Sequence, residues 1–79
     1  MDMTKVYDVN DFKDALALST LKEVSDILKE RGYNPINQIV GYLMSGDPGY
    51  ITSYKDARAK LTSLSQAKIL EVLVKEVVK

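Results

Sequence analysis

The chain has 79 residues, of which 46% are apolar and 28% charged, and its eleven basic and eleven acidic residues cancel. These values are typical of one globular domain and argue against global disorder. Cysteine and histidine are both absent, so disulfide bonds are excluded and the usual ligands of a structural zinc are missing. A domain this short buries only about 60% of the surface that its unfolded chain exposes, so we expect self-association to add stability.

The neutral charge balance also argues against a dedicated nucleic-acid binder, which would present a basic face. No apolar run approaches the ~20 residues that span a bilayer, and residues 1–10 lack the basic start and apolar stretch of a signal peptide. We therefore expect a cytoplasmic protein with no membrane insertion, metal or cofactor.

The chain begins with a segment that has no helical periodicity. Residues 1–9 mix Met, Asp, Thr, Lys, Val and Tyr, with apolar candidates for docking at Val6, Tyr7 and Val9. We predict that this segment is a mobile N-terminal arm and that residues 10–79 form a single helical domain.

The first predicted helix extends from Asn10, a candidate N-cap, to Arg31. Its apolar residues follow helical spacing in two clusters, and Thr20 with Glu23 resembles a capping box between them. The segment is therefore one bent helix or two abutting helices. Gly32 is the expected end, because glycine adopts the left-handed C-terminal conformation at little cost.

A second helix is predicted from Asn34, as cap, and Pro35, as first helical residue, to Gly46. Gly41 lies inside this helix at a cost of about 1 kcal/mol relative to alanine, which indicates that another backbone passes close by. Its apolar residues fall on one predicted face at i, i+3, i+4 and i+7: Ile36, Ile39, Val40 and Leu43.

After a turn at 47–49, Ser53 and Asp56 resemble a second capping box that starts a short helix. The last helix is predicted over residues 66–78, and its apolar residues cover more than half of its circumference. Such excess apolar surface predicts a homodimer. The predicted fold is thus an all-α compact bundle of four to five short helices, with a dimer interface at Ile69, Leu70, Leu73 and Val77.

The composition argues against catalysis. Without histidine and cysteine, the commonest general base and the best thiol nucleophile are missing. The acidic residues lie where a solvated helix face, a cap or the arm would place them, and no glycine pattern matches a phosphate-binding loop. We predict that the protein is not an enzyme.

A segment poor in charge, residues 32–50, combines tyrosines with side-chain amides. Such residues can serve as caps and core, or they can form a groove in which amides bind a partner's backbone and tyrosines supply contact area. The predicted partner-binding residues extend along the chain to an arginine: Tyr33, Asn34, Asn37, Gln38, Tyr42, Asp47, Tyr50, Tyr54 and Arg58.

The stretch GYNPINQIVGYLMSGDPGYITSYKDAR, residues 32–58, closely resembles the signature of the IreB/ReoM family, also called YrzL, of small Gram-positive cell-wall regulators. The sequence departs from the family pattern at Ser53 and over residues 62–67, where members often carry basic residues. The resemblance implies a helical homodimer with an N-terminal arm.

The resemblance also implies a function. A threonine in the arm, here Thr4, is phosphorylated by a PASTA-type Ser/Thr protein kinase and dephosphorylated by a PP2C-type phosphatase. The phosphorylation state controls peptidoglycan synthesis and cephalosporin resistance, in part through the Clp protease machinery and a cell-wall synthesis enzyme. Arg58 is our candidate cation for the phosphate.

Two hypotheses follow. The first is a non-enzymatic, phosphorylation-switched adaptor that acts through protein–protein contacts. The alternative is a small DNA-associated regulator with a helix-turn-helix-like pair that meets at residues 32–34. The helix after that turn carries no lysine or arginine over residues 35–45, which argues against a recognition helix.

Overall fold

The computed structural model describes residues 9–78. Within this part of the chain every regular element is helical, which confirms the predicted all-α fold. The elements follow the order α1 (Val9–Glu30), α2 (Pro35–Ser45), η1 (Pro48–Tyr50), η2 (Tyr54–Asp56), α3 (Ala57–Thr62) and α4 (Gln66–Val78). The predicted arm lies outside the described residues except for Val9, which is already helical, as is the predicted cap Asn10.

Helix α1 is one continuous helix of 22 residues, so the capping box predicted at Thr20 is wrong. The physical reason lies in the stripe of apolar side chains that passes this point without a break. Ala17, Leu21 and Val24 are all buried on the same side of the helix. Burial of that stripe outweighs the weak helix propensity of Thr20, since tertiary packing supplies most helix stability in proteins.

The end of α1 follows the local rule that the sequence predicts. Gly32 has a φ of 82°, in the left-handed region. The amide of Gly32 donates to the carbonyl of Lys29, and that of Tyr33 donates to the carbonyl of Leu28, each at 2.9 Å. This pair of hydrogen bonds is the Schellman motif, which satisfies two carbonyls at the end of the helix.

Both ends of α2 also match the prediction. The side chain of Asn34 accepts a hydrogen bond from the amide of Asn37 at 3.1 Å, and Pro35 occupies the first turn. At the other end Gly46 has a φ of 73°, and its amide donates to the carbonyl of Tyr42 at 2.7 Å. The helix is therefore bounded by backbone hydrogen bonds that neighbouring residues in the chain supply.

The predicted capping box at Ser53 is wrong, because its side chain makes no capping hydrogen bond. Lys55 and Asp56 have positive φ values of 51° and 61°, so the chain reverses once more before α3 begins at Ala57. Non-glycine residues in this region carry a backbone cost that surrounding contacts must offset. Contacts with Glu30, described below, hold this turn in place.

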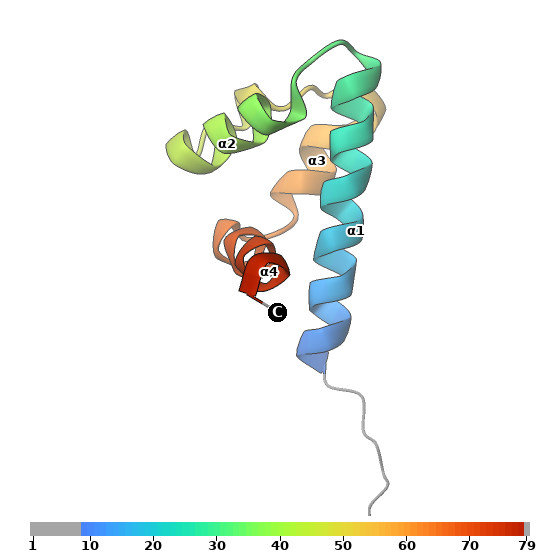
Figure 1. Cartoon of the computed structure of the whole chain (residues 1–79). Helices are drawn as coiled ribbons and strands as arrows, with labels where there is room; N and C mark the ends of the chain where they lie inside the picture. Colours follow the sequence, from blue (N-terminus) through green and yellow to red (C-terminus); the bar gives the residue numbers. More distant parts are fainter. Residues whose placement is uncertain (1–8, 79) are drawn as a thin grey trace, which may run out of the picture.

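Helices α2, α3 and α4 all pack on α1. Figure 1 shows α1 as the long axis of the molecule, with α2 and α3 beside its C-terminal half and α4 beside its N-terminal half. The largest fully buried side chains come from α1, the loop before α3, α3 and α4: Leu28, Ile51, Leu61, Ile69, Val24 and Val72. Each such aliphatic side chain contributes about 1.5–3 kcal/mol by leaving water.

Gly41 lies in the middle of α2, where the sequence predicts the close approach of another backbone. The structure places the aromatic ring of Tyr50 there instead, and a Cβ atom at Gly41 would overlap the Cδ1 and Cε1 atoms of that ring. The backbone of Tyr50 is held in turn, because the side-chain amide of Gln38 donates to its carbonyl at 2.9 Å. Glycine at this position therefore leaves room for the Tyr50 ring beside α2.

We predict that Gly41→Ala lowers stability, although alanine is favoured in a helix by about 1 kcal/mol. The added methyl group must displace the Tyr50 ring. Urea denaturation measures the difference. In a Tyr50→Ala background the same substitution should instead stabilise the protein, because no ring remains to be displaced. A higher denaturation midpoint for Gly41→Ala in the parent protein would contradict the close approach.

Candidate protein-interaction surface

Several residues that the sequence assigns to a partner groove have structural roles within the chain. Tyr42 is only 5% exposed and belongs to the core, so its assignment to a partner surface is corrected. Asn34 caps α2, and the side chain of Asp47 accepts from the amide of Gly49 at 2.8 Å. Sequence alone left caps and groove as alternatives, and for these side chains the geometry favours caps and core.

Two further predicted residues hold the loop that precedes α3. Gln38 donates to the carbonyl of Tyr50, and the Nε of Arg58 donates to the carbonyl of Ile51 at 2.9 Å. Ile51 is fully buried, so these two hydrogen bonds flank the point at which the loop enters the core. The side chains of Gln38 and Arg58 therefore help to hold the loop before α3 in place.

The turn at Lys55 is held to the end of α1 by Glu30. The hydroxyl of Tyr54 donates to Glu30 Oε2 at 2.8 Å, and Lys55 Nζ contacts Glu30 Oε1 at 2.9 Å. The Arg31 guanidinium lies 4.6 Å from the centre of the Tyr54 ring, within the range of a cation–π contact. Hydrogen bonds from Lys55 and then Tyr54 lower the pKa of Glu30 below its ordinary value. Tyr54 is thereby fixed on the surface beside two cations.

An exposed apolar stripe lies along α2. Its residues recur every four positions, and the exposed fraction of Met44 reaches 83%. The stripe consists of Ile36, Val40 and Met44. Sequence reasoning placed Ile36 and Val40 on one helical face with Ile39 and Leu43, but only the latter two pack against the core. The spacing of Ile36, Val40 and Met44 at i, i+4 and i+8 indicates that they share a second, exposed face of the helix.

The exposed side of α2 is also free of charge, because residues 35–45 include no acidic or basic side chain. Tyr33, Asn37 and Tyr50 are exposed close to it in the chain. An uncharged apolar surface does not fit the phosphate backbone of DNA, which is bound through cations. It fits the apolar core of a protein–protein interface.

Helix α4 carries a second apolar stripe. Ile69 is fully buried within the chain, so its assignment to a dimer interface is corrected: with Val72 it faces α1. At about 100° per residue, Leu70, Leu73 and Val77 lie within about 60° of one another on a side of the helix next to Ile69, and all three are exposed. These three residues remain the predicted dimer interface, and Val74 extends it.

A groove joins the two stripes. It has a volume of about 260 Å³ and runs between α2 and α4 over the surface of α1. Its lining is almost entirely apolar: Leu21, Ser25, Pro35, Ile36, Ile39, Val40, Leu43 and Leu73. Because Ile36 and Val40 belong to the α2 stripe and Leu73 to the α4 stripe, the two stripes border one continuous apolar depression.

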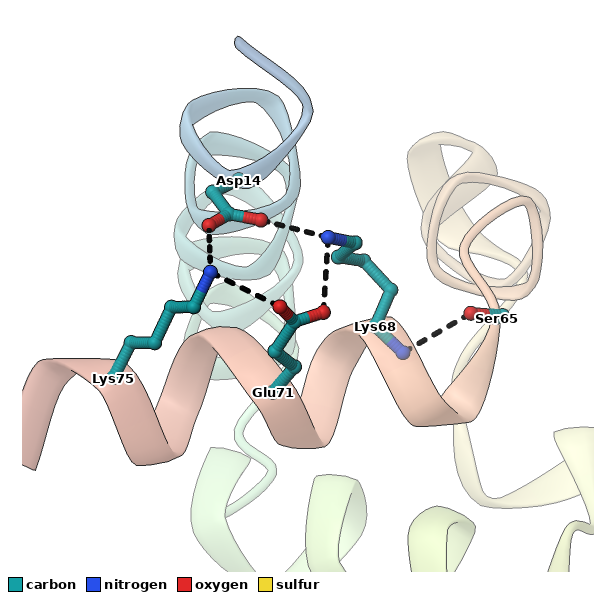
Figure 2. A network of polar contacts seen from close by, with 5 residues as sticks. All are labelled: Asp14, Ser65, Lys68, Glu71 and Lys75. Atoms are coloured by element: carbon teal, nitrogen blue, oxygen red, sulfur yellow. Dashed lines mark hydrogen bonds and ion pairs between the residues drawn. The ribbon is translucent and has the colours of Figure 1, made fainter. Parts of the chain in front are cut away.

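Four charged residues connect α1 to α4, as Figure 2 shows. Asp14 accepts from Lys68 at 2.8 Å and from Lys75 at 2.7 Å, and Glu71 contacts both lysines at 3.0 Å. The amide of Lys68 also bonds to the Ser65 hydroxyl at 3.0 Å, which caps α4. We call Asp14, Lys68, Glu71 and Lys75 the α1–α4 ion network.

The network changes the titration of its members. Hydrogen bonds from Lys68 and Lys75 lower the pKa of Asp14 below its ordinary value of 3.8, and the same lysines lower the pKa of Glu71 below 4.5. The reciprocal contacts with Asp14 and Glu71 raise the pKa of Lys75. The Asp14 side chain is only 15% exposed, and removal of its charge would leave the two ammonium groups of the network with Glu71 as their shared carboxylate.

Thr4, the predicted phosphorylation site, lies outside the described residues. Among residues 9–78 no cluster of acidic side chains could hold a metal ion, and none of the helices there combines the length and hydropathy that crossing a membrane requires.

Taken together, the described residues form a small all-α domain with apolar stripes on two of its helices. Residues 2–79 match the family model of the IreB regulatory phosphoprotein. Because the match covers nearly the whole chain, the protein belongs to the IreB family of regulatory phosphoproteins.

We predict that the α1–α4 ion network makes the protein sensitive to acid. Since the pKa values of Asp14 and Glu71 are lower in the folded state, their contribution to stability is present at neutral pH and is lost as the pH falls through those values. Asp14→Asn should lower the melting temperature at pH 7 and reduce its further decrease toward about pH 3. Asp26→Asn, on the same helix but outside the network, is the control. Equal pH profiles for Asp14→Asn and the parent protein would disprove the role of the network.

Proposed function

We propose that the protein is a phosphorylation-controlled regulator that acts through contacts with other proteins. In this proposal a PASTA-type Ser/Thr kinase phosphorylates Thr4, a PP2C-type phosphatase reverses the modification, and the two states set peptidoglycan synthesis and cephalosporin resistance. The observation that carries the proposal is the match of residues 2–79 to a family of regulatory phosphoproteins. The cytoplasm, where such a kinase domain acts, is the proposed location.

The arrangement of apolar surface supports action through protein contacts. Large contiguous apolar patches on a folded domain usually mark interaction sites. The α2 stripe, the α4 stripe and the groove between them supply such a patch, and Met44 and Val77 are among its most exposed members. We assign the α4 stripe to a homodimer and the α2 side, with Tyr33, Asn37 and Tyr50, to a downstream partner.

For the downstream partner we propose the Clp protease machinery or the cell-wall synthesis enzyme whose turnover it controls. Tyrosines and amides suit such a contact, because tyrosine offers a large rigid surface and an amide can bind an exposed peptide group. Arg58 and Tyr54 contribute indirectly to this partner surface, because their hydrogen bonds hold the loop before α3.

We predict that Leu73→Asp converts a dimer into a folded monomer. Leu73 is 39% exposed in the single chain, so a charge there is tolerated within the fold but penalised once a second copy covers it. Sedimentation at micromolar concentration measures the mass, for which 8.8 kDa is the monomer value, and circular dichroism verifies that the helices persist. Ser63→Asp, which adds the same charge outside the stripe, should remain a dimer. A parent protein that sediments as a monomer would rule out the dimer.

We predict that a PASTA-type kinase incorporates phosphate at Thr4. Peptide mass mapping after incubation with the kinase locates the site, and Thr4→Ala should abolish the modification while leaving the fold unchanged. Thr20, Thr52 and Thr62 serve as internal controls, since Thr62 already donates to the carbonyl of Arg58 at 2.8 Å within α3. Phosphate on these threonines in place of Thr4 would refute the proposed switch.

A further inference from the structure

The chain passes from the buried residue Ile51 to α3 through a tight turn that its own sequence does not favour. The amide of Ala57 donates to the carbonyl of Tyr54 and closes a four-residue turn. Its central residues have φ and ψ values of 51° and 32° at Lys55 and of 61° and 22° at Asp56. Two successive positive φ values define a type I′ turn, for which pairs such as Asn-Gly or Gly-Gly are strongly preferred. Lysine and aspartate therefore adopt this turn at a conformational cost.

Nearby residues in the chain offset little of this cost. Asp56 occupies the N-cap position of α3 without a side-chain capping bond, and the side chain of Ser53 makes none at the start of η2. An aspartate usually tolerates the left-handed region because its short side chain hydrogen-bonds locally. Backbone bonds do form, since the amides of Asp56 and Arg58 donate to the carbonyls of Ser53 and Thr52, each at 3.0 Å. Ser53, Asp56 and Arg58 are exposed, so water can replace these bonds when the turn opens.

A side chain 25 residues away holds the turn closed. Glu30, at the end of α1, accepts from the Tyr54 hydroxyl at 2.8 Å through Oε2 and from Lys55 Nζ at 2.9 Å through Oε1. The two donors are adjacent residues of the turn, so one carboxylate binds it at two points. The guanidinium of Arg31 lies over the Tyr54 ring, 4.6 Å from its centre, and adds a third contact from the end of α1. Because Lys55 is itself one of the strained residues, its bond to Glu30 acts directly on the strained backbone.

These contacts are weak enough to open. The side chains of Glu30 and Lys55 are 45% and 54% exposed, and exposed ion pairs contribute little to stability and are screened by salt. They oppose the cost of two non-glycine residues at positive φ, so the closed turn is favoured by only a small margin. The residues that border the segment differ, because Ile51 and Ala57 are fully buried in the core. Opening is thereby confined to residues 52–56.

We propose that residues 52–56 are a conformational switch with a closed and an open state. In the closed state, which is the one described above, Glu30 holds Lys55 and Asp56 at positive φ. In the open state both residues take negative φ values, and Tyr54 and Lys55 leave the carboxylate. Ile51 and Ala57 stay in the core in both states, so the helices persist.

The switch acts on the loop that supports the proposed partner surface. Arg58 holds this loop through two bonds, from its amide to the carbonyl of Thr52 at 3.0 Å and from its Nε to the carbonyl of Ile51 at 2.9 Å. Opening breaks the first of these bonds and frees Tyr54 from the end of α1. A partner that binds the closed loop therefore shifts the population toward the closed state. The switch is a property of the chain alone, whereas its effect on partners rests on the proposed function.

Amide hydrogen exchange of the full chain tests the switch. The amides of Ala57 and Arg58 are hydrogen-bonded in the closed turn and exchange when it opens. Glu30→Ala removes the carboxylate and preserves the helix, since alanine is the best helix former. Glu23→Ala is the matched control, because Glu23 also joins α1 to a lysine, Lys60 of α3, but has no contact with the strained turn.

We expect Glu30→Ala to lower the protection factors of these two amides at least fivefold relative to that of the core amide of Val24, and Glu23→Ala to change them less than twofold. Asp56→Gly should raise them at least twofold, because glycine takes a positive φ at little cost and no capping bond is lost. Combined with Glu30→Ala, the same glycine should return the protection factors toward those of the parent protein.

Unchanged protection with Glu30→Ala would overturn the switch, and so would an equal fall at every amide, since Glu30 would then support the fold as a whole. Unchanged or lower protection with Asp56→Gly would also overturn it, because the closed turn would carry no strain. Neither a partner nor a kinase takes part in these measurements, so their failure leaves the proposed function standing. A chain that is not phosphorylated at Thr4 in the mass-mapping experiment would refute the proposed function and leave the switch intact.

Discussion

Every other helix of this protein depends on the continuous apolar stripe of α1. Ala17, Leu21, Val24 and Leu28 are buried along one side of a helix of 22 residues, and α2, α3 and α4 pack on that helix at different levels (Figure 1). A single long helix can organise a small domain in this way, but it leaves the outer faces of its neighbours without cover. The apolar stripes of α2 and α4 are the consequence.

The loops between the helices are fixed by hydrogen bonds from a few polar residues. Asn34 and Asp47 cap the elements that follow them, and Gln38 and Arg58 bond to carbonyls on the two residues that lead into the core, Tyr50 and Ile51. Polar side chains that bond to backbone in this manner reduce the freedom of a loop without requiring a large core. The segment after α2 is therefore a rigid surface, which is the condition for presenting exposed tyrosines to a partner at low entropic cost.

The sequence predicted well what short-range rules control. The ends of α2 and the extent of α4 follow from Asn34, Pro35, Gly46 and Gln66, because caps and glycine stops act within four residues. The sequence-based prediction failed where residues far apart in the chain determine the local structure. The capping box predicted at Thr20 does not form, because α3 and α4 cover an apolar stripe that continues past it. The turn at Lys55 depends on Glu30, which is 25 residues away in the sequence.

The same distinction explains the predicted sites. Periodicity showed that α2 and α4 are rich in apolar residues, but only their position on α1 reveals that Tyr42 and Ile69 are buried while Met44 and Leu73 are exposed. The α1–α4 ion network could not be predicted at all, since Asp14 and Lys68 are separated by 54 residues. The exposed charges of such a network look like an ordinary solvated helix face until the packing brings them together.

Helix α4 is where these features meet. Ile69 and Val72 attach one of its sides to α1. Lys68 and Lys75, which Glu71 also contacts, bind Asp14 at a second side. Leu70, Leu73 and Val77 face outward. The contacts of Asp14 therefore set the orientation in which α4 presents its outer stripe. Because the α1–α4 ion network and the stripe lie on two sides of one helix, loss of the Asp14 charge would act on the element that carries the proposed dimer interface. Asp14, near the start of α1, is thus bound directly to the helix that carries the proposed dimer interface.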